Sequence, residues 1–200
     1  MRKILYVIVA LLFIQYSSAA QETNSSIKEL GINLSGSTFG IRYKTGNENT
    51  LFRLTLLSLR GSSYNYKSPS SNESRSNSHG LGFNFGFEKR KLISDGLNIY
   101  FGSDFLTSYQ RNRSKNEYTS YSATYTDLSL SPGLGLVLGF NYEISSRINI
   151  SAEVMPSISY TFTKSTNNND GTITKSTSTG LNYGLRTSGV NLTLSFNIGK

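Results

Sequence analysis

Apolar residues occupy every second position over long stretches of this 200-residue chain. Between residues 128 and 140 the even positions are Leu, Pro or Phe, while the odd positions are Gly or Ser apart from Val137. Side chains alternate between the two faces of a β-strand, so this pattern gives one apolar face and one small or polar face. The same alternation recurs in residues 81–88, 97–105, 148–162 and 190–198. The pattern predicts an all-β protein whose strands contact lipid, or a large core, on one face only.

The connections between these strands alternate between short and long. Residues 45–49, 89–96 and 141–146 are predicted to form short turns, whereas residues 64–79, 110–123 and 164–179 are long connections rich in Ser and Asn. Short turns at one end and long loops at the other are typical of outer-membrane barrels. We therefore expect a single antiparallel transmembrane β-barrel of about eight strands, with the long loops outside the cell.

Counting backward from the C-terminus places the individual strands. The last strand covers residues 180–200 with a bulge near Ser188 and Gly189, and the four before it start near residues 147, 124, 97 and 80. The third strand covers residues 50–62. The first two come from residues 21–44, where the apolar parity shifts, so we predict a tight turn at residues 35–37. One bent strand in this segment is the alternative, and it would give an odd strand count.

The N-terminal twenty residues are typical of an export signal. Arg2 and Lys3 precede an apolar run from residue 4 to residue 14, and the small residues at positions 17–20 suit a cleavage site. A membrane anchor, the alternative, needs roughly 18 or more apolar residues. We predict a signal peptide at residues 1–20 and one barrel domain at residues 21–200, located in the outer membrane. The chain has no cysteine, which excludes lipoprotein anchoring, disulfides and thiolate metal sites.

The charge balance narrows the choice of partners. The chain has 20 Lys and Arg against 12 Asp and Glu, and removal of Arg2 and Lys3 with the signal leaves 18 minus 12, a net charge of +6. Basic charge on an exported chain suits anionic lipid headgroups, and no recognition motif favours nucleic acid. We expect contact with outer-membrane lipid and lipopolysaccharide, no nucleic-acid binding, no cofactor, and a monomer.

These features together resemble one protein family. The signal ending at Ala20 and Gln21, the alternating strands and the aromatic-rich strand ends are similar to the small outer-membrane β-barrel family of Gram-negative bacteria. Within it they resemble the porin-like group common in Bacteroidota and outer-membrane protein X. Residues 187–194 also look like the signal by which the barrel assembly machinery recognises a last strand, although the chain ends at Lys200 and not at an aromatic residue. The resemblance implies the barrel fold, with the assembly machinery as a partner during biogenesis.

An eight-stranded barrel has an interior that side chains just fill, so we expect no open pore. Strand parity predicts a nearly balanced set of inward charges: Arg42, Arg53, Arg186, Glu88, Asp104, Asp127 and Glu153. Buried charges are tolerated only when they are paired and hydrogen-bonded. We therefore predict an arginine–carboxylate network that plugs and rigidifies the lumen. A proton or ion path along these charges is the alternative.

Other candidate sites lie at the outer end of the strands. Some eight-stranded barrels modify lipid A with a His, a Ser and an acid, but the single histidine, His79, lacks the His-x-Ser spacing, so we expect no enzyme. Asp170 and Gly171 follow three Asn residues as in part of a calcium loop, but the later Glu is missing, which predicts a hairpin tip instead.

Basic and aromatic residues also gather in the predicted outer loops. The basic residues are suited to bind lipopolysaccharide phosphates: Lys67, Arg75, Arg111, Arg113, Lys115, Lys164 and Lys175. The tyrosines would extend an aromatic belt above the membrane: Tyr64, Tyr66, Tyr109, Tyr118, Tyr121 and Tyr125. We therefore favour a structural, adhesion or lipopolysaccharide-binding role for the outer loops. The alternatives are a lipid A-modifying enzyme, a narrow pore, a subunit of a secretion assembly and a soluble exported β-domain.

Overall fold

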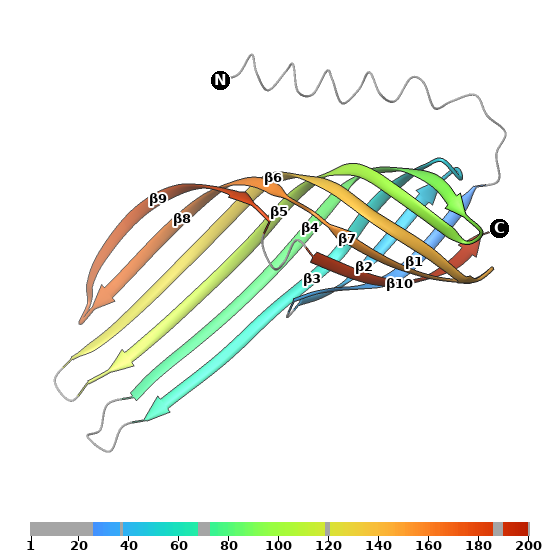
Figure 1. The fold of residues 1–200 in the computed structure, drawn as a ribbon. Coiled ribbons are helices and arrows are strands. Elements are labelled where there is room, and N and C mark those ends of the chain that lie inside the picture. Colours follow the sequence, from blue (N-terminus) through green and yellow to red (C-terminus); the bar gives the residue numbers. More distant parts are fainter. Residues whose placement is uncertain (1–25, 37, 68–72, 119–120, 186–189, 200) are drawn as a thin grey trace, which may run out of the picture.

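The computed structural model describes residues 26–36, 38–67, 73–118, 121–185 and 190–199, which form one antiparallel sheet of ten strands (Figure 1). The strands are β1 (Ile27–Ser35), β2 (Thr38–Gly46), β3 (Thr50–Lys67), β4 (Glu73–Ser94), β5 (Leu97–Glu117), β6 (Ser122–Ser145), β7 (Ile148–Val154), β8 (Ser157–Asn169), β9 (Thr172–Gly184) and β10 (Val190–Gly199). Within these ranges there is no helix long and apolar enough to cross a membrane. The predicted signal peptide at residues 1–20 lies outside the described residues.

Eight of these strands close into a ring. The hydrogen-bonded order is β1, β2, β3, β4, β5, β6, β7 and β10, and β10 pairs again with β1. From Leu34 the cross-strand pairing leads one way through Phe39, Leu59 and Leu81 to Tyr109, and the other way through Leu192, Ala152 and Phe140 to Ile99. The two routes arrive on β5 at positions 109 minus 99, or ten, residues apart. This stagger over eight strands corresponds to a strand tilt of about 40°.

The remaining two strands continue members of this ring. β7 and β8 lie end to end, both paired with β6, and are separated at Met155 and Pro156. Proline has no N–H to donate to the ladder, which accounts for the break. β9 pairs with β8 in the same way that β10 pairs with β7, so β9 and β10 also follow one another along one edge of the sheet. The prediction of an all-β barrel of about eight strands is therefore confirmed for the ring, although ten strands are counted.

The exterior of the ring is apolar. Alternate residues of every ring strand expose large hydrophobic side chains, including Leu30, Ile32 and Leu34 of β1, Leu134, Leu136 and Leu138 of β6, and Leu192, Leu194 and Phe196 of β10. The positions between them point into the lumen and are buried, as Asn33, Val137 and Thr193 show. An apolar outside and a polar inside invert the arrangement of a soluble protein, and are the arrangement of a transmembrane barrel.

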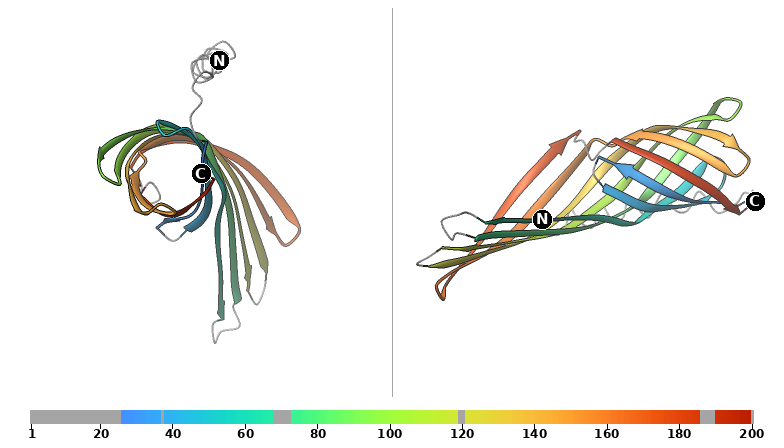
Figure 2. Two further views of the ribbon diagram at one scale, coloured as in Figure 1. Left: turned by 90° about the vertical axis from the view of Figure 1, so that its right-hand side faces the viewer. Right: turned by 90° about the horizontal axis from the view of Figure 1, so that it is seen from below.

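The predicted long outer loops are wrong, because most of their residues belong to strands. β6 has 24 residues, whereas a strand crosses a bilayer with about 9 to 11 residues. Beyond the short β1–β2 hairpin the strands β3, β4, β5, β6, β8 and β9 continue as an open sheet that leaves the ring on one side (Figure 2). We call this part, residues 61–67, 73–80, 110–117, 122–129, 163–169 and 172–178, the extended sheet. A Ser- and Asn-rich sequence predicts a loop, but in this chain the neighbouring strands supply hydrogen-bond partners that make these segments strands.

Two predicted turns are confirmed. Ser35 pairs with Thr38, so residues 27–46 form a hairpin and not one bent strand. Asn169 pairs with Thr172, and the two residues between them, Asp170 and Gly171, have φ values of 46° and 87°. Positive φ at both central residues of a two-residue turn matches the twist of the flanking strands, and Asp-Gly tolerates it. The bulge predicted near Ser188 and Gly189 falls outside the described residues.

The apolar exterior makes a direct prediction about stability. Replacing Leu136, whose side chain is 63% exposed on the ring, with Arg is expected to lower the free energy of unfolding by about 2–4 kcal/mol in lipid, because the charge faces hydrocarbon. Urea titration of the refolded protein in lipid vesicles measures this. Thr124→Arg is the control, since Thr124 lies on the same face of β6 within the extended sheet, and it should change stability little. Equal losses from both variants would show that the apolar face is not in contact with hydrocarbon.

Candidate functional site

A single guanidinium stands at the centre of the ring. Arg53 of β3 is 1% exposed and contacts three carboxylates. Its Nη1 lies 3.0 Å from Glu88 on β4, its Nη2 lies 2.8 Å from Glu153 on β7, and its Nε lies 3.1 Å from Asp104 on β5. The first two contacts are hydrogen bonds, whereas the third is an ion pair without a hydrogen bond to Asp104 Oδ1. Arg53 thereby connects strands on opposite walls of the barrel.

Further charged pairs surround this centre. Arg42 of β2 lies 2.9 Å from Glu153, and Lys44 of the same strand donates to both oxygens of Glu88 at 3.0 Å. Arg90 of β4 donates to Glu29 at 2.6 and 2.9 Å and also to Glu88 at 2.8 Å. The network therefore has four cations, Arg42, Lys44, Arg53 and Arg90, and four anions, Glu29, Glu88, Asp104 and Glu153. We call these eight residues the plug.

Neutral side chains complete the plug. The Tyr100 hydroxyl donates to Glu153 at 3.0 Å, and the Tyr100 ring lies 4.9 Å from the Lys44 ammonium. Asn191 of β10 donates to Glu153 at 3.2 Å, while Thr193 accepts from Arg42 at 3.1 Å. Satisfying the remaining polar atoms in this way is the condition for a buried ionic cluster to be tolerated. The side chains of the plug and these partners come from every ring strand except β6.

The sequence makes room for the plug with glycine. Gly86 pairs with Asp104 and also with Arg53, and Gly102 pairs with Glu88. A Cβ at Gly86 would collide with the Ser103 carbonyl oxygen and the Asp104 carboxylate, and one at Gly102 with the Phe87 carbonyl oxygen. The missing side chains leave the centre of the lumen free for the Arg53 guanidinium.

The structure brings together five of the seven predicted lumen residues: Arg42, Arg53, Glu88, Asp104 and Glu153. The prediction is wrong for Asp127, which faces the same side of its strand but pairs with Asn112 and Ser165. Asp127 lies eight residues along β6 from Gly135, the partner of Asp104, or roughly 26 Å along the strand. Parity identifies the face of a strand but not the height. Arg186 lies outside the described residues.

Three residues of the plug, Glu29, Lys44 and Arg90, are not among the predicted lumen residues, and neither is their neighbour Tyr100. Lys44 has the parity of Arg42, and Tyr100 has that of Asp104, so alternation alone would have found both. Arg90 was assigned to a turn, but β4 continues to Ser94. Glu29 would have followed from pairing β1 with β2, in which it lies opposite Lys44.

Between the plug and the extended sheet the lumen is hollow. The prediction that side chains fill the barrel therefore holds only at the plug. A cavity of about 610 Å³ opens toward the extended sheet and is lined mostly by Ser, Thr, Asn and Gly residues, and none of the described residues that line it is charged. Met155 and Leu106 contribute apolar surface at its base, beside Tyr100 and Val137. Ser131 and Thr161 share a hydrogen bond of 2.8 Å, and Asn182 donates to Thr161 at 3.0 Å. We call this cavity the vestibule.

Basic residues gather on the outward face of the extended sheet. The last largely apolar row across the sheet is Leu81, Tyr109, Leu130 and Phe162, and the next row outward is His79, Arg111, Leu128 and Lys164. Arg113 follows in the row after that, opposite Asn77 and Thr126. Arg111, Arg113, Lys164 and Lys175 form no ion pair with a described residue, whereas Arg75 pairs with Glu73 and Lys115 with Glu117. The hydrogen bond from Lys115 lowers the pKa of Glu117, which keeps that pair ionised.

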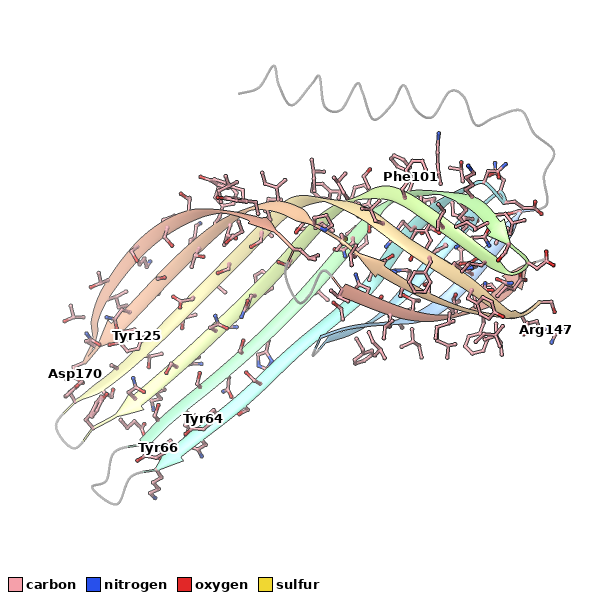
Figure 3. The ribbon with its side chains drawn as sticks, viewed as in Figure 1. Tyr64, Tyr66, Phe101, Tyr125, Arg147 and Asp170 are labelled. Atoms are coloured by element: carbon pink, nitrogen blue, oxygen red, sulfur yellow. The ribbon has the colours of Figure 1, made fainter. Side chains whose placement is uncertain are left out.

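The predicted aromatic belt is placed differently from expectation, and His79, for which no catalytic role is predicted, lies on a strand. Only Tyr109 of the six predicted tyrosines lies at the edge of the apolar exterior. Tyr64, Tyr66 and Tyr125 lie near the far end of the extended sheet (Figure 3), and Tyr118 stacks on Tyr121 at 4.4 Å beside the β5–β6 tip. His79 is exposed on the outward face opposite Arg111, with no acidic residue directly across from it.

Two solved structures of outer-membrane proteins are similar to this chain at low sequence identity. No protein-family model and no curated protein matches the chain. A major outer membrane protein from Thermus thermophilus is similar over 86% of this chain and 99% of its own, with 11% identity and a TM-score of 0.45. CarO from Acinetobacter baumannii is similar over 90% of this chain and 100% of its own, with 10% identity and a TM-score of 0.37. The fold assignment rests on the closed ring itself. The chain is a closed antiparallel β-barrel with an apolar exterior, the arrangement of a transmembrane barrel.

The plug yields a prediction about stability and conductance. Glu153→Gln removes the charge that faces Arg42 and Arg53, and loss of one partner in a buried ion pair typically costs about 3–5 kcal/mol. We expect urea titration to show that loss, while planar-bilayer recordings show little steady conductance before or after the change. Asp127→Asn, which neutralises an inward-facing carboxylate of β6 outside the plug, is the control and should change stability by no more than about 0.5 kcal/mol. A large, steady wild-type conductance would contradict a closed lumen.

The vestibule yields a second prediction. Since the chain has no cysteine, single cysteines report accessibility without background. In the folded barrel, Ser131→Cys in the vestibule should react rapidly with a polar maleimide. Ser195→Cys, at a position 3% exposed on the inner wall, should react slowly until the protein is unfolded. Equal rates in the folded state would mean that the two positions share one open channel.

Proposed function

We propose that this protein is a non-enzymatic integral barrel of the outer membrane that binds lipopolysaccharide phosphates on the outward face of its extended sheet. One observation carries the proposal, the register between the apolar and basic rows. The row that contains Arg111 and Lys164 follows directly on the row that contains Tyr109 and Phe162. Consecutive rows on one face lie about 6.6 Å apart along the strand. The first free cations therefore lie where hydrocarbon gives way to phosphorylated headgroups.

The chemistry of this row suits phosphate. Arg111 and Arg113 are two residues apart on β5, so both guanidinium groups emerge from one face with about one row between them. A guanidinium donates two parallel hydrogen bonds to a phosphate, and such charge-assisted bonds are stronger than neutral ones. With Lys164 across Leu128 and Lys175 across Thr166, the surface offers several positive charges without a carboxylate partner. This arrangement can bind a headgroup that carries more than one phosphate.

The rest of the molecule supports a binding role over transport or catalysis. The plug blocks the lumen with eight balanced charges that are paired with one another, which disfavours a steady ion path. His79 is opposite Arg111 on the outward face of the extended sheet and away from the plug carboxylates, which disfavours a His-acid catalytic pair. The extended sheet itself is held by continuous ladders from β3 to β9, so it presents these side chains on a stiff surface.

The test removes the two arginines. Arg111→Gln combined with Arg113→Gln should weaken binding of purified lipid A by roughly tenfold or more, since each charge-assisted hydrogen bond contributes about 1.5–3 kcal/mol. Native mass spectrometry of the detergent-solubilised barrel, titrated with bisphosphorylated lipid A, measures the change. The conservative pair Arg111→Lys and Arg113→Lys should keep part of the affinity, because charge remains and the planar fork is lost.

Two controls separate phosphate recognition from general lipid binding. Lys89→Gln with Lys91→Gln removes two exposed charges from β4 near the opposite end of the barrel and should leave the affinity unchanged. Dephosphorylated lipid A should bind the wild type and the Arg111 and Arg113 variant equally. Unchanged binding of bisphosphorylated lipid A by the double Gln variant would refute the proposal.

A further inference from the structure

The two faces of the extended sheet have opposite chemical character. The outward face carries the basic residues described above. The other face continues the inner wall of the barrel, and its rows are Ser62, Ser78, Asn112, Asp127, Ser165 and Ser176, then Tyr64, Ser76, Ser114, Tyr125, Asn167 and Thr174. In these rows hydroxyl and amide groups dominate, with Asp127 as the single charged residue. We call this surface the inner face.

The inner face leads into the vestibule. The row between them runs from Arg60 on β3 through Gly80 to Gln110, Ser129, Thr163 and Ser178, and the last four line the cavity. Inside the cavity, where no described lining residue is charged, a charged ligand would give up its hydration without meeting an opposite charge, which is unfavourable. An apolar ligand would leave a wall of hydroxyl and amide groups without water or partners. The lining therefore matches a neutral ligand that carries many hydroxyl groups.

We propose that the vestibule and the inner face bind a neutral oligosaccharide. The hydroxyl groups of Ser129, Ser131 and Thr163 each make one cross-strand hydrogen bond, at 2.8 Å. A hydroxyl offers one donor and two acceptor sites, so each keeps capacity for a ligand. Leu106 and Met155 at the base supply apolar surface for the C–H face of a sugar ring. A volume of about 610 Å³ is within the roughly 300–1,000 Å³ typical of ligand sites.

Tyrosines extend the same site away from the membrane. Tyr64 and Tyr125 lie in one cross-strand row of the inner face, separated by Ser76 and Ser114, and they are 63% and 42% exposed. Tyrosine presents a rigid amphipathic ring with a polar tip, suited to stack on one sugar and donate to another. This row lies four residues beyond the Gln110 row on β5, or about 13 Å. The site is therefore long enough for a chain of sugars and favours oligosaccharides over single sugars.

A cavity-filling variant tests this site. Gly180 lines the vestibule, and a Cβ there would meet no heavy atom within 4 Å, so Gly180→Phe places a ring in open space. The probe is a printed array of neutral and acidic oligosaccharides, followed by calorimetry with the neutral glycan that binds best. We expect the wild type to select neutral oligosaccharides and Gly180→Phe to weaken binding at least tenfold. Thr177→Phe, on the outward face of the same strand, is the matched control and should bind as the wild type does.

Retained heat-modifiable gel mobility shows that each variant is folded. If Gly180→Phe does not fold, Ser131→Ala with Thr161→Val removes hydroxyl groups from the vestibule wall and should also weaken binding at least tenfold. Absence of any neutral glycan among those captured by the wild type overturns the inference, as does wild-type affinity in the folded vestibule variant. Capture of acidic glycans alone, lost with Arg111→Gln and Arg113→Gln, would assign binding to the outward face. This inference does not depend on phosphate binding, because the two sites lie on opposite faces.

Discussion

The demand of the Arg53 guanidinium for three carboxylates constrains the whole barrel. Glu88, Asp104 and Glu153 come from β4, β5 and β7, so all three can contact one group only across a narrow lumen. A ring of eight strands with a stagger of ten residues provides such a width. Glycine at positions 86 and 102 fits this narrow ring, because a Cβ at Gly86 would collide with the Asp104 carboxylate and one at Gly102 with the backbone of Phe87 and Glu88. Ring size, stagger and glycine placement are thus matched to one buried charge.

The molecule divides its surfaces by chemistry along and across the strands. The ring is apolar outside and ionic inside, and the plug closes its lumen. Beyond the β1–β2 hairpin, β3, β4, β5, β6, β8 and β9 turn one basic face outward and one face rich in hydroxyl and amide groups toward the vestibule. Side chains alternate along a strand, so every second residue of β5 belongs to one surface and the residues between belong to the other. Arg111 and Arg113 on one side and Gln110 and Asn112 on the other illustrate it.

Alternation in the sequence predicted much of the fold and part of the plug, for a physical reason. Period-two patterning reports which face a side chain occupies, so Arg42, Arg53, Glu88, Asp104 and Glu153 were assigned inward correctly. It does not report height, which depends on register across strands far apart in the chain, and Asp127 was therefore misplaced. Strand length was the other failure. Ser- and Asn-rich segments lack apolar positions to mark them as strands, and their ladders are held by neighbours and not by a core. Arg90 was lost to the same error.

The plug also has a consequence for how the chain matures. Thr193 bonds to Asn33 across a sequence separation of 160 residues, and Arg53 bonds to Glu153 across 100. Contacts of such high order form slowly, after the intervening loops have closed. Until β10 pairs with β1 the interior remains open to water, and each carboxylate and guanidinium keeps its own hydration. Completion of the ring exchanges hydration for the ion pairs that Glu153 forms with Arg42 and Arg53 across the lumen. A chain that lacks either end cannot make this exchange, so the charged interior distinguishes a finished barrel from an unfinished one.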